Sequence, residues 1–299
     1  MTGSERVAIR ARRLRFGWEA TPLHWARDPQ TTHTLNVLHL LLPAGERWFV
    51  ELYRRVLPDV TDERLRADVR GFVGQEATHA RAHAAVLDHL ADQGIDTAPY
   101  TRWVEWLFDR LLSDTPLGRH LRLPRPLARR WTRHRLGIVA AIEHCTAALG
   151  GWLLAARAYE TPGAVDPMML DMLRWHAAEE VEHRAVAFDL YVDQGGGYLE
   201  RLVTAVEVVP VLLGMWVAGT AFLLRRDPTR PGRPTVRAFD RAAREGWLPS
   251  AGTLARMLPA YLRPGHHPLQ RGSTAAAVAY LARSPAAAAT AAKGDEQDR

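Results

Sequence analysis

Two copies of the motif Glu-x-x-His have the clearest chemical potential in this sequence. They run from Glu76 to His79 and from Glu180 to His183. Residues three positions apart lie on the same face of an α-helix, so each pair can direct both side chains at one metal ion. A single copy would be weak support, because exposed helices often carry Glu and His at this spacing. The interpretation depends on what accompanies the two copies.

Each copy is preceded by a glutamate in the helical segment before it, Glu46 in the first case and Glu143 in the second. We count about 1.5 Å per residue down one predicted helix and up the next. This count brings Glu46 level with Glu76, and Glu143 level with Glu180. The second predicted hairpin therefore repeats the first. The predicted metal ligands are Glu46, Glu76, His79, Glu143, Glu180 and His183.

Four carboxylates and two imidazoles in a bundle interior would be very costly if they were left unpaired. Two divalent cations would neutralise the four carboxylates. The same arrangement, with a Glu on each of two helices and Glu-x-x-His on each of the other two, is typical of di-iron and di-manganese carboxylate bundles. We therefore predict two divalent metal ions, with iron preferred and with manganese or zinc as alternatives.

Two further residues are placed to orient the predicted histidine ligands. Glu179 directly precedes Glu180, a position where similar di-iron enzymes such as the ribonucleotide reductase small subunit place an acid behind the opposite histidine. This similarity implies that Glu179 accepts a hydrogen bond from His79 and fixes its tautomer. Gln75 would do the same for His183, and an exposed amide is the alternative for this residue.

Two more histidines lie on the same helical stripes as the ligands. His83 follows His79 by four residues, and His176 precedes Glu180 by four. They would serve as pocket bases or extra ligands, and simple packing is the alternative. The predicted catalytic residues are His83, His176 and Glu179.

Helical periodicity dominates the chain, and no alternating segment between hairpin turns suggests a sheet. The fold class is therefore all-α. Two long hairpins joined by a crossover predict a ferritin-like four-helix bundle with additional C-terminal helices. We expect Pro43 to kink or restart the first helix. The expected long helices are 34–57, 61–92, 127–158 and 167–192, with a shorter one at 102–112.

Changes in composition divide the chain into four parts. A Pro-rich linker lies within the third part, and the last part is rich in Ala and then charged. The predicted parts are an N-terminal arm (1–32), the di-metal bundle (33–197), C-terminal helices (198–283) and a disordered tail (284–299).

The C-terminal part contains an apolar stretch at residues 208–224. Seventeen residues fall just short of the roughly 20 that span a bilayer, and Glu207 opposes an extension. We expect a buried or partner-covered helix, packed under residues 236–262, rather than membrane association. Peripheral membrane contact through residues 208–224 stays open.

The net charge of +6 comes almost wholly from arginines, since Lys293 is the only lysine. These arginines are scattered among acids, which argues against nucleic-acid binding. The basic run at residues 10–15 is expected to be a solvated arm. Cys145 is the only cysteine, so no intrachain disulfide can form, and no cleavable signal is evident. A cytoplasmic location is expected.

The chain also resembles a known bacterial family, the predicted metal-dependent hydrolases, over about residues 10–285. The resemblance implies a metal-dependent activity and specifies no substrate. The residues that carry it are Thr32-His33, Asn36, Pro43-Ala-Gly-Glu46-Arg47, Gly74-Gln75-Glu76, His79, His83, and Ala178-Glu179-Glu180-Val-Glu182-His183-Arg184-Ala-Val186-Ala-Phe188-Asp189.

Two classes of enzyme fit the predicted ligands. In the preferred hypothesis, an oxidoreductase with a di-iron or di-manganese centre activates dioxygen to oxidise a small apolar or amphipathic substrate. In the alternative, a metal-dependent hydrolase lowers the pKa of a bound water. A non-enzymatic iron-binding helical protein is the third hypothesis, and a homodimer stays open.

Overall fold

The computed structural model describes residues 7–12, 14–116, 123–270 and 272–286, and all regular structure within them is helical. The all-α prediction is confirmed. The helices are α1 (Pro29–Val56), α2 (Glu63–Asp92), α3 (Ala98–Trp106), α4 (Arg125–Ala155), α5 (Pro167–His183), α6 (Val186–Asp193), α7 (Tyr198–Arg226), α8 (Val236–Arg244), α9 (Ala251–Tyr261) and α10 (Thr274–Leu281).

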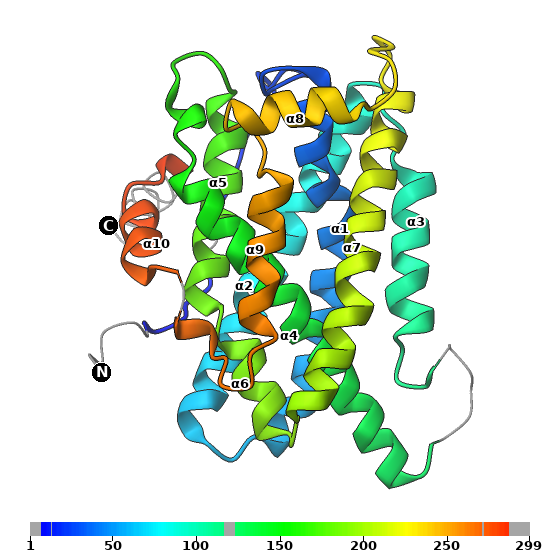
Figure 1. Cartoon of the computed structure of the whole chain (residues 1–299), viewed down its shortest axis with the longest axis vertical. Coiled ribbons are helices and arrows are strands. Elements are labelled where there is room, and N and C mark those ends of the chain that lie inside the picture. The colour runs from blue at the N-terminus through cyan, green and yellow to red at the C-terminus, as the bar shows by residue number, and fades with distance from the viewer. Residues whose placement is uncertain (1–6, 13, 117–122, 271, 287–299) are drawn as a thin grey trace, which may run out of the picture.

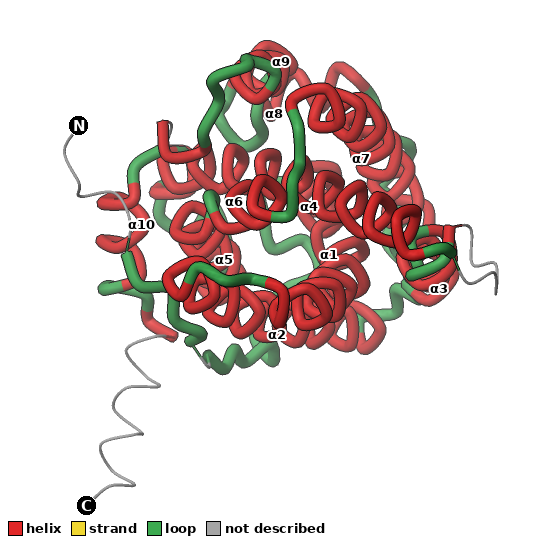
Figure 2. The backbone as a smooth tube through the Cα atoms, turned by 90° about the horizontal axis from the view of Figure 1, so that it is seen from below, coloured by secondary structure: helices red, strands yellow, loops and turns green. Residues whose placement is uncertain are grey.

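Two helical hairpins form the centre of the molecule. α1 packs on α2 and α4 packs on α5, while α2 also contacts α5 and α1 contacts α4. These four helices surround a common interior, seen end-on in Figure 2. α3 covers α1, α7 lies against α1 and α4, and α10 flanks α5 (Figure 1). The interior of the two hairpins is therefore closed off from solvent on several sides.

Helix α1 begins earlier than predicted and is not interrupted. The Asp28 side chain accepts a hydrogen bond from the Thr31 backbone N–H at 2.9 Å, which caps the helix ahead of Pro29. The helix then continues through Pro43 to Val56, so the expectation that Pro43 restarts the helix is wrong. Packing of α1 against α2, α3 and α7 offsets the hydrogen bond that proline cannot donate.

The predicted helix at 167–192 is instead broken directly after His183. The guanidinium of Arg184 donates to the carbonyl of Val181 at 2.6 Å and to the hydroxyl of Thr274 at 2.8 Å. A continuous helix would use the Val181 carbonyl for the N–H of Ala185. The chain therefore turns at this point, and α6 packs on α2 and α4.

The start of the predicted disordered tail is ordered. Ser284 and Ala286 are buried, and the Ala286 N–H donates to the Asp171 carboxylate at 2.9 Å. Residues 287–299 of that prediction lie outside the described residues.

Helix α7 contains the apolar stretch and is covered differently from the prediction. It packs on α1 and α4, and its outward face stays exposed rather than lying under residues 236–262. By length and composition, α4 and α7 could each cross a membrane; 50% of the apolar window of α4 is buried, against 28% for α7. The exposed apolar residues of that face are Leu199, Val203, Val206, Leu213 and Val217.

Candidate metal centre

The six predicted ligands lie together in the interior of the two hairpins. α1 contributes one of them, α2 two, α4 one and α5 two. Each is at most 2% exposed. The long helices place them at one level, as the count of residues along each hairpin predicted. They are Glu46, Glu76, His79, Glu143, Glu180 and His183.

One half of the cluster surrounds His183. Its Nε2 atom lies 2.9 Å from a carboxylate oxygen of Glu143, 3.5 Å from Glu76 and 3.6 Å from Glu180. One ligand atom from each of these four residues lies within 4.8 Å of the others. A single ion could contact all four.

The other half surrounds His79. Its Nδ1 atom lies 3.6 Å from Glu76 and 3.8 Å from Glu180. Glu46, Glu76 and His79 form a second group whose ligand atoms are within 4.8 Å of one another. Glu76 and Glu180 thus lie close to both histidines, where a carboxylate could bridge two ions.

Several ligand atoms in this cluster are buried without a hydrogen bond within the described part of the chain. A buried polar atom with no partner costs about 1–3 kcal/mol, and more if it is charged. Oxygen and imidazole donors are the ligands that divalent transition metals accept. The residues therefore fit a metal site. The atoms are Oε1 and Oε2 of Glu46, Oε1 and Oε2 of Glu76, and His79 Nδ1. Glu143 Oε2 and His183 Nε2 also lack a hydrogen bond, but they lie 2.9 Å apart as an ion pair.

Both predicted histidine ligands are oriented from behind by a buried acceptor. His79 lies with Nε2 2.9 Å from Glu179, which leaves Nδ1 facing the other ligands. His183 lies with Nδ1 3.0 Å from the side-chain oxygen of Gln75, which leaves Nε2 facing them. Such contacts fix the ring and its tautomer. Gln75 is fully buried, so the alternative of an exposed amide is wrong.

Arg12 joins the two orienting groups. Its guanidinium donates to Glu179 at 2.7 Å and to both oxygens of Glu182 at 2.8 and 2.9 Å. Glu182 in turn accepts from the amide of Gln75 at 2.7 Å. The expectation of a solvated arm is therefore wrong for Arg12, because the buried carboxylates of α5 attract it inward.

Three imidazoles extend from the cluster toward the N-terminal half of α1. His176 Nε2 is 2.9 Å from Glu180, and His176 Nδ1 is 2.5 Å from His83 Nε2. The other ring nitrogen of His83 lies 2.7 Å from Nδ1 of His39. The predicted residues His83 and His176 are thus linked to the cluster, with His176 in direct contact and His83 behind it.

Burial and mutual repulsion perturb the carboxylates in the absence of metal. Burial and the neighbouring Glu76 raise the pKa of Glu46 well above its usual value. Burial and Glu180 raise the pKa of Glu143 to about 8. Burial also acts to raise the pKa of Glu180, but the charges of His183 and His176 outweigh it and lower this pKa well below the usual range. Metal-free protein therefore holds extra protons in this interior.

The histidines divide into two classes. Burial alone would lower the pKa of His79 and of His183, but Glu179 in the first case and Glu180 in the second outweigh it and raise both pKa values well above normal. Burial and the charge of His176 lower the pKa of His83 well below normal.

Sequence reasoning missed several residues of this site, including Glu182, which accepts hydrogen bonds from both Arg12 and Gln75. His39 and Tyr53 lie seven positions before and after Glu46, a two-turn spacing that could have identified them. Thr146 follows Glu143 by three and donates to Glu180 through a short hydrogen bond. Arg12 carried no local signal, because its partners are more than 160 residues away.

The comparison with known families agrees with this geometry. A family model described as "Predicted metal-dependent hydrolase" matches residues 10–272. The chain belongs to this family. No curated protein and no solved structure matches it. In this member of the predicted metal-dependent hydrolase family, the matched region contains all six clustered ligands, Arg12 and the three-imidazole chain.

Proposed function

We propose that this chain is a hydrolase that holds two divalent metal ions in the bundle interior and acts on a small apolar or amphipathic substrate. One observation carries the proposal: four buried carboxylates and two oriented imidazoles converge, with unpaired donor atoms facing one another. Such ions, when bound, supply Lewis acidity and lower the pKa of a coordinated water. The family description supports hydrolysis over the oxidoreductase hypothesis.

The protein's own residues would hold the ions and handle the proton. Glu76 and Glu180, which lie close to both His79 and His183, would help to hold both ions. Nε2 of His176 lies 2.9 Å from Glu180 and 4.0 Å from Glu46, so the protonated ring could donate a proton beside the carboxylates. His83 would stabilise the charged ring of His176 from behind. His83 and His176 are therefore proposed as catalytic, and Glu179 as the residue that positions His79.

An aromatic wall next to His183 supports an apolar substrate. The ring of Phe72 lies 4.7 Å from that of His183, and Tyr53 stacks on Phe72 at 4.8 Å. The Tyr53 hydroxyl is buried without a partner among the described residues. It could therefore donate a hydrogen bond to a polar group of an otherwise apolar molecule.

Dioxygen activation is the second candidate function. The set of four carboxylates and two imidazoles in a helical bundle is the one that supports di-iron chemistry, which is an argument by analogy with other bundles. The identity of the metal separates the two functions.

The test is a metal analysis followed by two activity assays. We expect the purified protein to contain metal and to cleave ester or amide substrates, and Glu143→Ala and His183→Ala to lose metal and at least 100-fold in activity together. Glu207→Ala is the control, because Glu207 forms an ion pair with His134 away from the site. Oxygen consumption by the ferrous protein without hydrolysis would replace the proposal with the second candidate. Metal binding without either activity would favour a non-enzymatic role.

We also propose that the exposed face of α7 rests on an anionic membrane surface. Its exposed apolar residues are spaced four, three, seven and four positions apart, so they form one stripe along the helix. The same groove that contains Leu199 and Val203 is lined by Arg130 and Arg133 of α4, and by Glu200. Glu200 pairs with Arg133 at 2.7 Å, which leaves Arg130 as the uncompensated charge among the described residues of the groove. An arginine side chain can bind the anionic headgroups of a bilayer, and the apolar stripe beside it can contact the acyl chains.

Flotation with vesicles tests this proposal. Wild-type protein should float with phosphatidylglycerol-containing vesicles and less well as salt rises, whereas Leu213→Glu with Val217→Glu should stay behind. Val236→Glu is the control, because Val236 is 77% exposed on α8, away from the stripe. If the stripe instead joins two copies of the chain, the wild-type protein should be a dimer that does not float with vesicles. The double variant should then be a monomer.

A further inference from the structure

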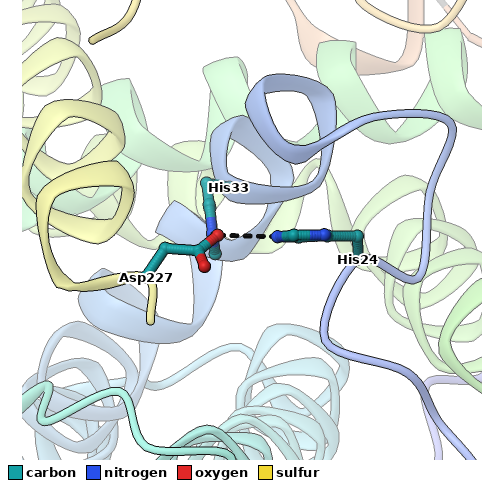
Figure 3. Close-up of side chains that lie close together, drawn as sticks. All are labelled: His24, His33 and Asp227. Atoms are coloured by element: carbon teal, nitrogen blue, oxygen red, sulfur yellow. Dashed lines mark hydrogen bonds and ion pairs between the residues drawn. The ribbon is translucent and has the colours of Figure 1, made fainter. Parts of the chain in front are cut away.

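A second group of metal-binding side chains lies outside the candidate centre. His24 is in the loop before α1, His33 is near the start of α1, and Asp227 caps the end of α7. Oδ2 of Asp227 lies 2.6 Å from Nε2 of His24 and 2.8 Å from Nε2 of His33 (Figure 3). The three ligand atoms are within 4.8 Å of one another.

This group is separate from the candidate centre. His33 and Glu46 both lie on α1, and their separation of 13 positions corresponds to about 20 Å along the helix. One ion cannot reach both places, so any metal held by this group would be an additional one.

The ligand types suit a zinc-like ion. Two imidazoles and one carboxylate form a three-ligand set that leaves a fourth position for water. Bonds of about 2.0–2.1 Å to a tetrahedral ion place neighbouring ligand atoms roughly 3.3 Å apart. The observed distances of 2.6 and 2.8 Å therefore need to open by a fraction of an ångström. His24, whose side chain is 25% exposed on a loop, can make this movement.

The surroundings hold the three ligands in place. The second oxygen of Asp227 accepts from the backbone N–H and the hydroxyl of Thr229 at 2.8 and 2.7 Å, which leaves Oδ2 to face the imidazoles. The loop of His24 is tied down directly after it, because the indole of Trp25 donates to Asn36 at 2.7 Å. Groups of this kind orient metal ligands and raise affinity.

We propose that His24, His33 and Asp227 bind one divalent transition-metal ion of the zinc class, which clamps the loop before α1 to the end of α7. Asp227 lies about 200 residues after His24 and His33 in the sequence. Figure 1 shows the start of α1 and the end of α7 at the same end of the molecule. His33 and the Asp227 carboxylate are buried, and the partly exposed His24 completes the site from the solvent side. The role of the ion is structural.

Zinc binding by paired variants tests the clamp. His24→Ala would be made both in the wild-type protein and in a Glu143→Ala/His183→Ala background that disables the candidate centre. In each background, equilibrium dialysis should show one zinc ion fewer per chain when His24 is replaced. Zinc should also slow amide hydrogen exchange in residues 18–28 only where His24 is present. If the candidate centre binds no metal, replacement of His24 should still remove one zinc ion per chain.

Two further variants separate a metal site from a hydrogen-bonded triad. Asp227→Asn removes the charge but keeps an oxygen that can accept from one imidazole, so it should lose zinc while the protein stays folded. His267→Ala is the matched control, because it breaks another His and Asp pair, with Asp189 at 3.0 Å. Equal zinc binding with and without His24 would overturn the proposal.

Discussion

Replacing Arg12 by alanine should lower metal affinity by about 10- to 100-fold, the usual cost of removing a group behind a metal ligand. It should also lower the free energy of unfolding by about 3–5 kcal/mol, because two buried carboxylates lose their shared counter-charge. The affected residues are Glu179 and Glu182, which orient His79 directly and His183 through Gln75. One substitution on the arm should therefore disturb both histidines.

Two matched variants make this prediction specific. Arg12→Lys keeps the charge but cannot bond both carboxylates with a planar fork, so it should give intermediate affinity. Arg10→Ala removes a nearby exposed arginine whose backbone carbonyl, rather than its side chain, contacts Gln75, and it should have little effect. Metal titration and denaturant unfolding measure both quantities. If Arg12→Ala and Arg10→Ala behave alike, the arm has no part in the centre.

Between about pH 6.5 and 8, the free energy of unfolding should fall with rising pH in the metal-free protein and rise with pH in the metal-loaded protein. In the metal-free protein, Glu143 has its pKa raised to about 8, and the pKa values of Glu46, His79 and His183 are also raised. The folded state therefore holds protons that the unfolded state has released. Such stability is present at low pH and lost as pH rises through the folded pKa values.

Metal reverses the sign, because protons compete with the ion for the same ligands. The loaded protein should lose stability as pH falls, while the metal-free protein gains about 1.4 kcal/mol per pH unit for each retained proton. Below pH 6.5 the histidines with lowered pKa values, such as His83, begin to oppose this gain. Urea unfolding at several pH values, with chelator or with metal, measures both slopes.

Glu143→Gln provides the control for this experiment. The amide is neutral at every pH, so the metal-free variant should show a shallower dependence than the wild type, while its metal affinity falls. Parallel slopes for the two forms of the wild-type protein would mean that the metal binds elsewhere.

The convergence of the six candidate ligands could be predicted because helical geometry alone decides whether Glu46 lies level with Glu76. Similarity to other di-iron enzymes led to Glu179 as the partner of His79, and the matching position before Glu76 led to Gln75 as the partner of His183. The role of Arg12 could not be predicted, because its partners lie on α5 and no pattern in the sequence joins them. The break after His183 depends on a contact between Arg184 and Thr274 across the fold. The packing of α7 also depends on contacts between distant segments, so the sequence led to residues 236–262 as its cover, whereas α7 packs on α1 and α4.

The wide separation of the ligands along the chain has a consequence for how the protein is made. Glu46, Glu76 and His79 belong to the first hairpin and emerge from the ribosome long before Glu180 and His183. Contacts between such distant segments form late in folding, since the loop between them must first close. The acidic face of the first hairpin therefore stays exposed to solvent until the second hairpin has been synthesised and packs on it. Productive metal capture should follow emergence of the second hairpin, and nascent chains ending near residue 160 should be prone to aggregation.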